Sequence, residues 1–257
     1  MKNLFLVVLA VCLLVGCSKN DENNDINDDS LKVIMPLGVG YTWNYIDSTF
    51  TSAGKVESVD SSRLGITGYI NDSIKAYLWN WYDFESKKYD DAPWLVNTND
   101  KGFILYGFTY NNVRYFNNNK NNYLYFIYPV NLNDKWTAFD MDYVVDESNK
   151  KVTIHSDTIN CVCSSISKKL HTKAGDFDCY IYTSSKTNSE GNVIEQSMYF
   201  APNVGYVGGI QKKNGNVFYK KILKSYSLVS TGTSVSKVKS KQNLINAKNH
   251  NFFGIER

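Results

Sequence analysis

The stretch of sequence that decides the fold class is Ile74-Lys75-Ala76-Tyr77-Leu78-Trp79-Asn80-Trp81-Tyr82-Asp83-Phe84. Tyr77, Trp79 and Trp81 recur at every second position, which is the side-chain period of a β-strand. Aromatic side chains favour strands because they pack well on a pleated surface. The pattern therefore predicts a long aromatic strand, in which the adjacent Trp81 and Tyr82 point to opposite faces of the sheet.

Shorter segments of the same kind extend to both sides of this strand, separated by polar turns. They cover residues 41–46, 55–60, 63–70, 103–110, 113–116, 123–128, 143–145, 152–155, 158–164, 177–182, 193–200, 205–211 and 217–228. The asparagine-rich residues 117–122 are predicted to form a hairpin loop between two of them. No stretch has helical periodicity long enough for a βαβ crossover. We predict an all-β domain over residues 31–229, an antiparallel meander that forms a half-open barrel or a strongly curved sheet.

Composition agrees with an aromatic β protein and excludes one large class of function. The chain has 257 residues, of which 14% are aromatic, with 19 Tyr and 13 Phe. Its 28 Lys and Arg nearly balance its 25 Asp and Glu. This charge is too small for a nucleic-acid-binding surface, so we expect no nucleic-acid partner.

The N-terminus reads as an export signal that ends in a lipidation site. Lys2 supplies a positive charge, residues 4–14 supply a short apolar run, and Leu14-Val15-Gly16-Cys17 reads as a lipobox. A transmembrane helix is the rival interpretation, but the apolar run is too short to span a bilayer. We predict a signal peptide over residues 1–16 and a membrane anchor on Cys17, where several acyl chains give stable binding.

The residues beside the folded region are polar at both ends. Residues 17–30 are acidic and cannot bury enough apolar surface to order themselves, so we predict a flexible tether. Residues 230–257 form a basic tail, and residues 244–257 are predicted to be either a short docking helix or disordered.

Three cysteines remain in the folded region, in a compartment that permits disulfides. Cys161 and Cys163 share one face of a predicted strand, and the following strands bring Cys179 back nearby. A bridge from Cys179 to either of the other two is one alternative, and three buried thiols are the other. His155 and His171 do not have the spacing of a zinc site, so we expect no metal.

Three segments resemble exported bacterial lipoproteins of the Bacteroidota type. They are Pro36-Leu37-x-x-Gly40-x-x-Trp43-x-Tyr45, Ala174-Gly175-Asp176-Phe177-Asp178-Cys179-Tyr180 and Tyr199-Phe200-Ala201-Pro202-Asn203-Val204-Gly205-Tyr206-Val207. The resemblance implies an antiparallel half-barrel related to lipoprotein carriers (LolA-like), with a concave apolar face. Residues 17–22 also resemble a signal for export to the outer face of the outer membrane. We therefore expect anchoring in the outer membrane, on its periplasmic face or at the cell surface.

No catalytic motif is present, so we expect neither enzymatic activity nor a cofactor. Aromatic side chains are the remaining candidates for binding, and the set comprises Trp79, Trp81, Tyr82 and Trp94. The first functional hypothesis is an anchored half-barrel that binds an apolar ligand or lipid. The alternative is a carbohydrate-binding or adhesion module of a cell-surface complex. Protein partners are not indicated by the sequence.

Overall fold

The computed structural model describes residues 32–116, 123–146, 151–188, 190–229 and 250–251. The chain divides into two compact units, Met1–Lys32 and Val33–Arg257, and every described strand belongs to the second. The predicted signal peptide, Cys17 and the tether lie outside the described residues, and so does most of the basic tail. Within the described residues, no helix is long and apolar enough to cross a membrane.

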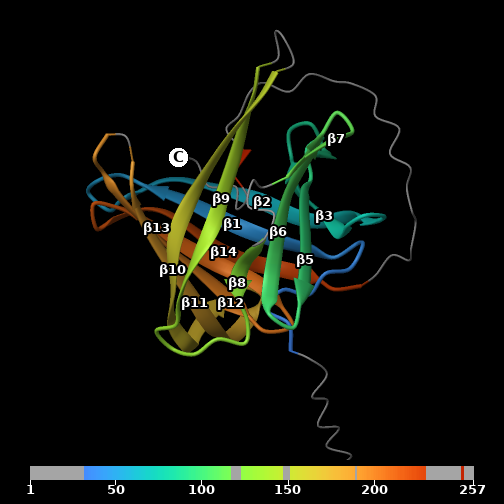
Figure 1. Cartoon of the computed structure of the whole chain (residues 1–257). Helices are drawn as coiled ribbons and strands as arrows, with labels where there is room; N and C mark the ends of the chain where they lie inside the picture. Colours follow the sequence, from blue (N-terminus) through green and yellow to red (C-terminus); the bar gives the residue numbers. More distant parts are fainter. Residues whose placement is uncertain (1–31, 117–122, 147–150, 189, 230–249, 252–257) are drawn as a thin grey trace, which may run out of the picture. The chain divides into compact units, whose positions relative to one another are not determined.

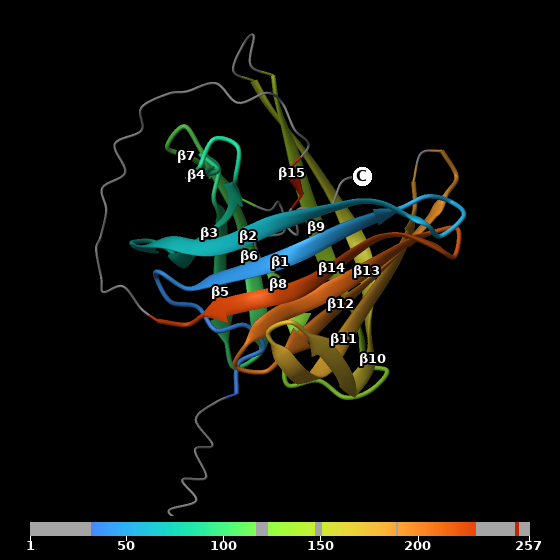
Figure 2. The same ribbon diagram turned by 180° about the vertical axis from the view of Figure 1, so that it is seen from behind.

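The described strands form one antiparallel sheet made of two meanders (Figures 1 and 2). The N-terminal meander contains β1 (Thr42–Phe50), β2 (Val56–Asn71), β3 (Lys75–Asp83), β4 (Lys88–Tyr89), β5 (Trp94–Asn99), β6 (Gly102–Tyr110), β7 (Val113–Phe116) and β8 (Leu124–Ile127). The C-terminal meander contains β9 (Lys135–Asp146), β10 (Lys151–Thr172), β11 (Gly175–Thr187), β12 (Val193–Ala201), β13 (Gly205–Lys213) and β14 (Asn216–Ser227). A short strand, β15 (His250–Asn251), pairs with β9.

The strand order is β15-β9-β10-β11-β12-β13-β14-β1-β2-β3-β5-β6-β7, so the two meanders join where β14 pairs with β1. We call this junction the seam. In Figure 2, β1 and β14 lie side by side at the middle of the sheet. The predicted all-β antiparallel meander is confirmed.

The sheet curves until strands from its two halves face each other. The ring of Tyr143 on β9 stacks on Phe108 of β6 with centroids 4.0 Å apart. The ring of Phe126 on β8 stacks on Tyr182 of β11 at 4.9 Å. Among the described strands, β7 and β15 end the order without pairing with each other, so the sheet is strongly curved and not a closed barrel.

Successive side chains on a strand point to alternate faces of the sheet, and this alternation decides which side chains enter the core. On β1, Trp43 and Tyr45 are buried while Asn44 and Ile46 point to the other face. Trp43 Nε1 donates a hydrogen bond to Val204 O (2.7 Å), and Tyr45 OH donates to Tyr206 O (3.0 Å). Both aromatic side chains therefore enter the core with their polar atoms satisfied.

Several expectations about strands are wrong, because pairing at long range overrides the local pattern. The segments 55–60 and 63–70 belong to one strand, β2, which pairs with β1 on both sides of residues 61–62. The segments 152–155 and 158–164 belong to one strand, β10, since β9 pairs without a break from Lys151 to Val162. The segments beside the asparagine-rich loop do not pair as a hairpin. Instead, β7 and β8 each pair with β6, where Gly107 and Gly102 leave room for the close approach of the neighbouring backbone.

The C-terminal tail also differs from expectation where the structure describes it. His250 and Asn251 pair as a strand with Tyr143 and Asp142 of β9. The short helix expected as one alternative for residues 244–257 is therefore not formed at these two positions, and the other residues of that segment lie outside the described part.

Candidate functional site

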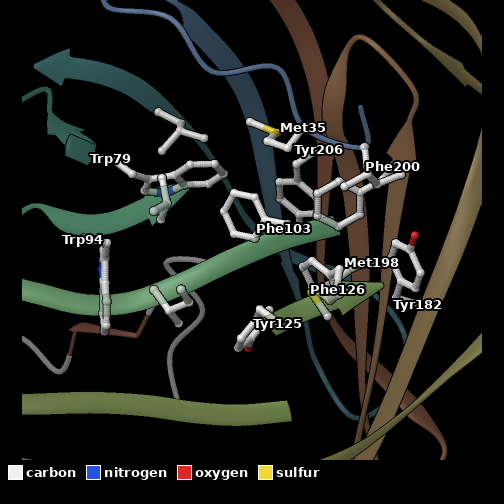
Figure 3. Close-up of a cluster of buried hydrophobic side chains, with 14 of the residues drawn as sticks. Met35, Trp79, Trp94, Phe103, Tyr125, Phe126, Tyr182, Met198, Phe200 and Tyr206 are labelled. Carbon is white, nitrogen blue, oxygen red and sulfur yellow. The ribbon is translucent and has the colours of Figure 1, made fainter. Parts of the chain in front are cut away.

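Two of the four candidate ligand-binding aromatics lie in the core. Trp79 is 0% exposed and Trp94 is 2% exposed. Trp79 packs on Phe103 with ring centroids 5.6 Å apart, and Figure 3 shows these two side chains. Trp94 packs on Tyr143 with ring centroids 5.6 Å apart. Neither indole presents a face to solvent, so the candidates that remain for binding are Trp81 and Tyr82.

The concave face of the sheet is filled by the protein's own side chains. Aromatic rings from β6 and β8 meet rings from β11, β12 and β13, as Figure 3 shows for Phe103, Phe126, Tyr182, Phe200 and Tyr206. Each of these five side chains is at most 1% exposed. These rings are therefore buried against one another and against the rest of the core.

Trp81 and Tyr82 lie on opposite faces of β3. The ring of Trp81 faces the interior, 6.1 Å from the ring of Tyr45. The ring of Tyr82 lies on the outer face, beside the rings of Phe84 (5.2 Å) and Tyr89 (5.1 Å). Both neighbours meet Tyr82 edge-to-face, which is a favoured geometry for aromatic pairs.

Tyr82 belongs to a continuous row of side chains across the outer face of five strands. The row runs in register from β14 through β1, β2 and β3 to β4, and we call it the outer row: Ser225, Asn44, Arg63, Tyr82 and Tyr89. Residues that face each other directly on neighbouring strands put their side chains on the same face of a sheet. The outer row therefore places two amphipathic aromatic rings beside amide, guanidinium and hydroxyl groups.

Arg63 is the centre of the outer row. Its Nε donates to Asn44 Oδ1 (2.7 Å), and Asn44 Nδ2 donates in turn to Ser225 Oγ (3.1 Å). Its guanidinium carbon lies 5.0 Å from the ring centroid of Tyr82 and 5.4 Å from that of Phe84. Cation–π contacts at these distances hold the guanidinium against the aromatic pair.

The outer row is accessible to a ligand. Phe84, which adjoins it, is 44% exposed, and Arg63, Tyr82 and Tyr89 are partly buried. Partial burial raises the pKa of the Tyr89 hydroxyl, so at neutral pH this group is protonated and can donate a hydrogen bond. The arrangement can recognise a ligand with both a ring face and polar substituents.

A second polar cluster lies on the inner face of the seam. Lys221 is 1% exposed, and its Nζ donates to Ser62 Oγ (3.0 Å) and lies 3.4 Å from Asp47 Oδ1. The same nitrogen lies 4.0 Å from the ring centroid of Trp81 and 5.1 Å from that of Tyr45. Burial lowers the pKa of Lys221 to about 8, although Asp47 opposes this shift. Every contact of this ammonium is internal, so we assign the cluster a structural role.

Sequence reasoning missed Arg63, Asn44, Tyr89 and Lys221. Alternation along residues 217–223 could have indicated Lys221, because it shares its face with the buried Leu223. The outer row could not be found in this way, since its members come from five strands and meet only through the pairing register.

The three cysteines are buried in β10 and β11. Cys163 faces Tyr182 and Cys179 faces Lys168, which puts these two cysteines three residues apart along β11, or roughly 10 Å. Cys161 faces Ser184 and lies farther still from Cys179. A disulfide needs Cα atoms within about 7 Å, so neither bridge fits this register. The Cys163 thiol instead donates to Ser165 O (3.3 Å).

Among the described residues, no three His, Cys, Asp or Glu side chains gather closely enough to hold a metal ion. His171 and Asp176 form a pair of potential metal ligands on an exposed hairpin, with Nδ1 and Oδ1 2.6 Å apart. It needs no metal to explain it, since the two side chains satisfy each other.

Two solved structures are similar to this chain. One is a predicted exported protein with a YmcC-like fold from Bacteroides fragilis, at 12% identity and a TM-score of 0.43, covering 76% of this chain and 99% of that one. The other is a predicted lipoprotein from Parabacteroides distasonis, at 14% identity and a TM-score of 0.39, with the same two coverages. No protein-family model matches the chain, and neither does any curated protein. The LolA-like relationship stays a prediction.

Proposed function

We propose that this chain is a non-catalytic binding module, anchored by lipid on Cys17, and that its outer row holds a saccharide. The observation that carries the proposal is the position of Arg63, fixed between Asn44 and the rings of Tyr82 and Phe84 on an accessible face. A saccharide combines apolar ring faces with many hydroxyl groups, and it therefore needs aromatic surface and hydrogen-bonding groups close together.

The outer row supplies both kinds of contact on rigid elements. Tyr82 and Phe84 offer aromatic surface at low cost in conformational entropy, because each ring is held by its neighbours. Arg63, Asn44 and Ser225 offer donors and acceptors along the same line. A site built on paired strands keeps these groups in fixed positions relative to one another.

The anchor is supported by the N-terminal sequence. Leu14-Val15-Gly16-Cys17 follows a short apolar run, and the acidic residues 18–30 would let a folded domain stand away from the membrane surface. We place the module at the outer membrane, on its periplasmic face or at the cell surface. A Cys17→Ser variant is expected to move from the membrane fraction to the soluble fraction of the host cell.

An apolar ligand or lipid on the concave face is the other binding function that the sequence suggests. Such a ligand needs unfilled apolar surface, and the aromatic side chains of that face are buried against one another. Displacing them would cost core packing that stabilises the domain. This observation favours the outer row over the concave face as the binding site.

We also propose that the outer row binds its ligand without catalysing a reaction. The charged groups of the buried cluster at Lys221 contact protein groups only, and the outer row contains no pair of carboxylates for acid–base chemistry. The groups of the outer row are therefore suited to binding a ligand without converting it.

Affinity electrophoresis of the full chain in gels that contain soluble polysaccharides tests the proposal. We expect at least one neutral or acidic polysaccharide to retard the wild type. Phe84→Ala should weaken this binding by about tenfold, as for a central contact in a small site. Phe116→Ala is the matched control, because Phe116 is 37% exposed on β7 and lies outside the outer row. Unretarded migration of the wild type in every gel would overturn the proposal.

A further inference from the structure

Arg63 has an unused hydrogen-bonding edge. Its Nε binds Asn44, and the described residues provide no acceptor for Nη1 or Nη2. No carboxylate forms an ion pair with it in the described part of the chain. The outer row therefore carries one positive charge, and none of its five members is acidic.

The other arginine that the structure describes shows how this side chain behaves when a carboxylate is in reach. Arg114 donates from Nη1 to Asp72 Oδ1 (3.0 Å) and from Nη2 to Asp72 Oδ2 (2.6 Å). This two-point geometry suits the planar guanidinium and is stronger than a neutral hydrogen bond. The pKa of Asp72 is lowered to about 2, mainly by this bond to Arg114. The same edge of Arg63 is open to a carboxylate from outside the protein.

The position of the guanidinium is already fixed before any ligand arrives. The bond to Asn44 and the contacts with the rings of Tyr82 and Phe84 hold the group in place. Fixing a flexible side chain in advance reduces the entropy lost on binding. The aromatic pair beside it provides a surface for the ring that bears the charged group.

We propose that the ligand of the outer row is an acidic saccharide, whose carboxylate accepts two hydrogen bonds from the Nη atoms of Arg63. This inference rests on the proposed function, since it specifies the class of saccharide bound there. Charge complementarity selects a uronic-acid residue over a neutral sugar. The aromatic pair selects a carboxylate carried on a ring over a simple organic acid.

Isothermal titration calorimetry with the full chain tests the inference. The probes are oligosaccharides of galacturonate, mannuronate and hyaluronan, each paired with its methyl ester, which removes the charge and keeps the ring. We expect at least one acid to bind about tenfold more tightly than its ester, which is the loss expected for a charge-assisted contact. Arg63→Gln should bring the acid and its ester to equal affinity. The control Arg114→Gln should leave the preference intact.

The outcomes separate the inference from the function on which it rests. Equal binding of every acid and its ester would overturn the acidic saccharide and leave saccharide binding in place. If the acids, the esters and neutral oligosaccharides such as cellotriose all fail to bind, the proposed function is overturned as well. Binding of succinate as strong as that of the acidic oligosaccharides would overturn the assignment to a saccharide.

Discussion

Lys221 and Asp47 face each other directly across the seam, with Lys221 Nζ 3.4 Å from Asp47 Oδ1. The seam is the place where the two meanders pair, so this contact joins the N-terminal and C-terminal halves of the sheet. A register slip of one residue would turn one of the two side chains to the outer face and leave the other charge buried alone. The pair therefore specifies the register of the seam.

Removing the negative partner should cost more than removing the positive one. Asp47→Asn leaves a fully buried ammonium without its counter-charge and should reduce the free energy of unfolding by about 3 kcal/mol. Lys221→Met leaves Asp47 with the hydroxyl of Tyr219 as a donor, so this variant should lose less stability than Asp47→Asn. Urea unfolding at pH 7 measures both values. An equal loss in the two variants would contradict a role for burial of the charge.

The stability of the wild type relative to the Lys221→Met variant should rise between pH 8 and pH 10. Burial lowers the pKa of Lys221 to about 8 in the folded state, whereas an unfolded lysine keeps a pKa of about 10.4. Between these values the unfolded chain binds more protons, so raising the pH favours the folded state, by on the order of 2 kcal/mol. The buried thiols and tyrosines oppose this trend equally in both proteins, because burial raises the pKa of Cys179 and of Tyr45 in the folded state.

Urea midpoints at pH 7, 8, 9 and 10 measure this rise. The Lys221→Met variant is its control, and its midpoint should fall progressively behind that of the wild type over this range. An equal change with pH in the two proteins would assign the effect to other groups.

The aromatic core should be far more sensitive to truncation than the outer row. Phe126 is fully buried and packs on Tyr182 and Phe200, so Phe126→Ala should cost about 3–5 kcal/mol. Phe84 is 44% exposed, and Phe84→Ala should change stability by about 1 kcal/mol or less. Thermal unfolding of both variants checks the contrast. A large loss in Phe84→Ala would mean that the outer row is a structural element.

The thiols of Cys163 and Cys179 should resist modification in the folded protein. Burial raises the pKa of Cys163, and it raises the pKa of Cys179 to about 12, so neither forms the reactive thiolate at neutral pH. Iodoacetamide should label them only after unfolding, as peptide mass mapping would detect. Labelling of the native protein would contradict the burial of these thiols. A peptide pair linked through these residues would contradict the register of β10 and β11.

Local patterns in the sequence predict the strands better than they predict the site. The two-residue period of residues 74–84 places Trp81 and Tyr82 on opposite faces of β3, and it correctly indicates an antiparallel β protein. Burial cannot be assigned from the same pattern, because Trp79 and Trp94 are covered by strands distant in sequence. Arg63 stands between Asn44 and Tyr82 only through the registers of two strand pairs, and a single sequence does not reveal those registers.

A glycan array probed with the full chain and with the Arg63→Ala/Tyr82→Ala double variant tests the central claim most directly. Both substitutions lie on the outer face, and circular dichroism should show the sheet intact in both proteins. We predict that the wild type binds a set of saccharides rich in uronic acids and that the double variant loses this set. The same binding pattern in both proteins, or no binding by the wild type, would contradict a saccharide site on the outer row.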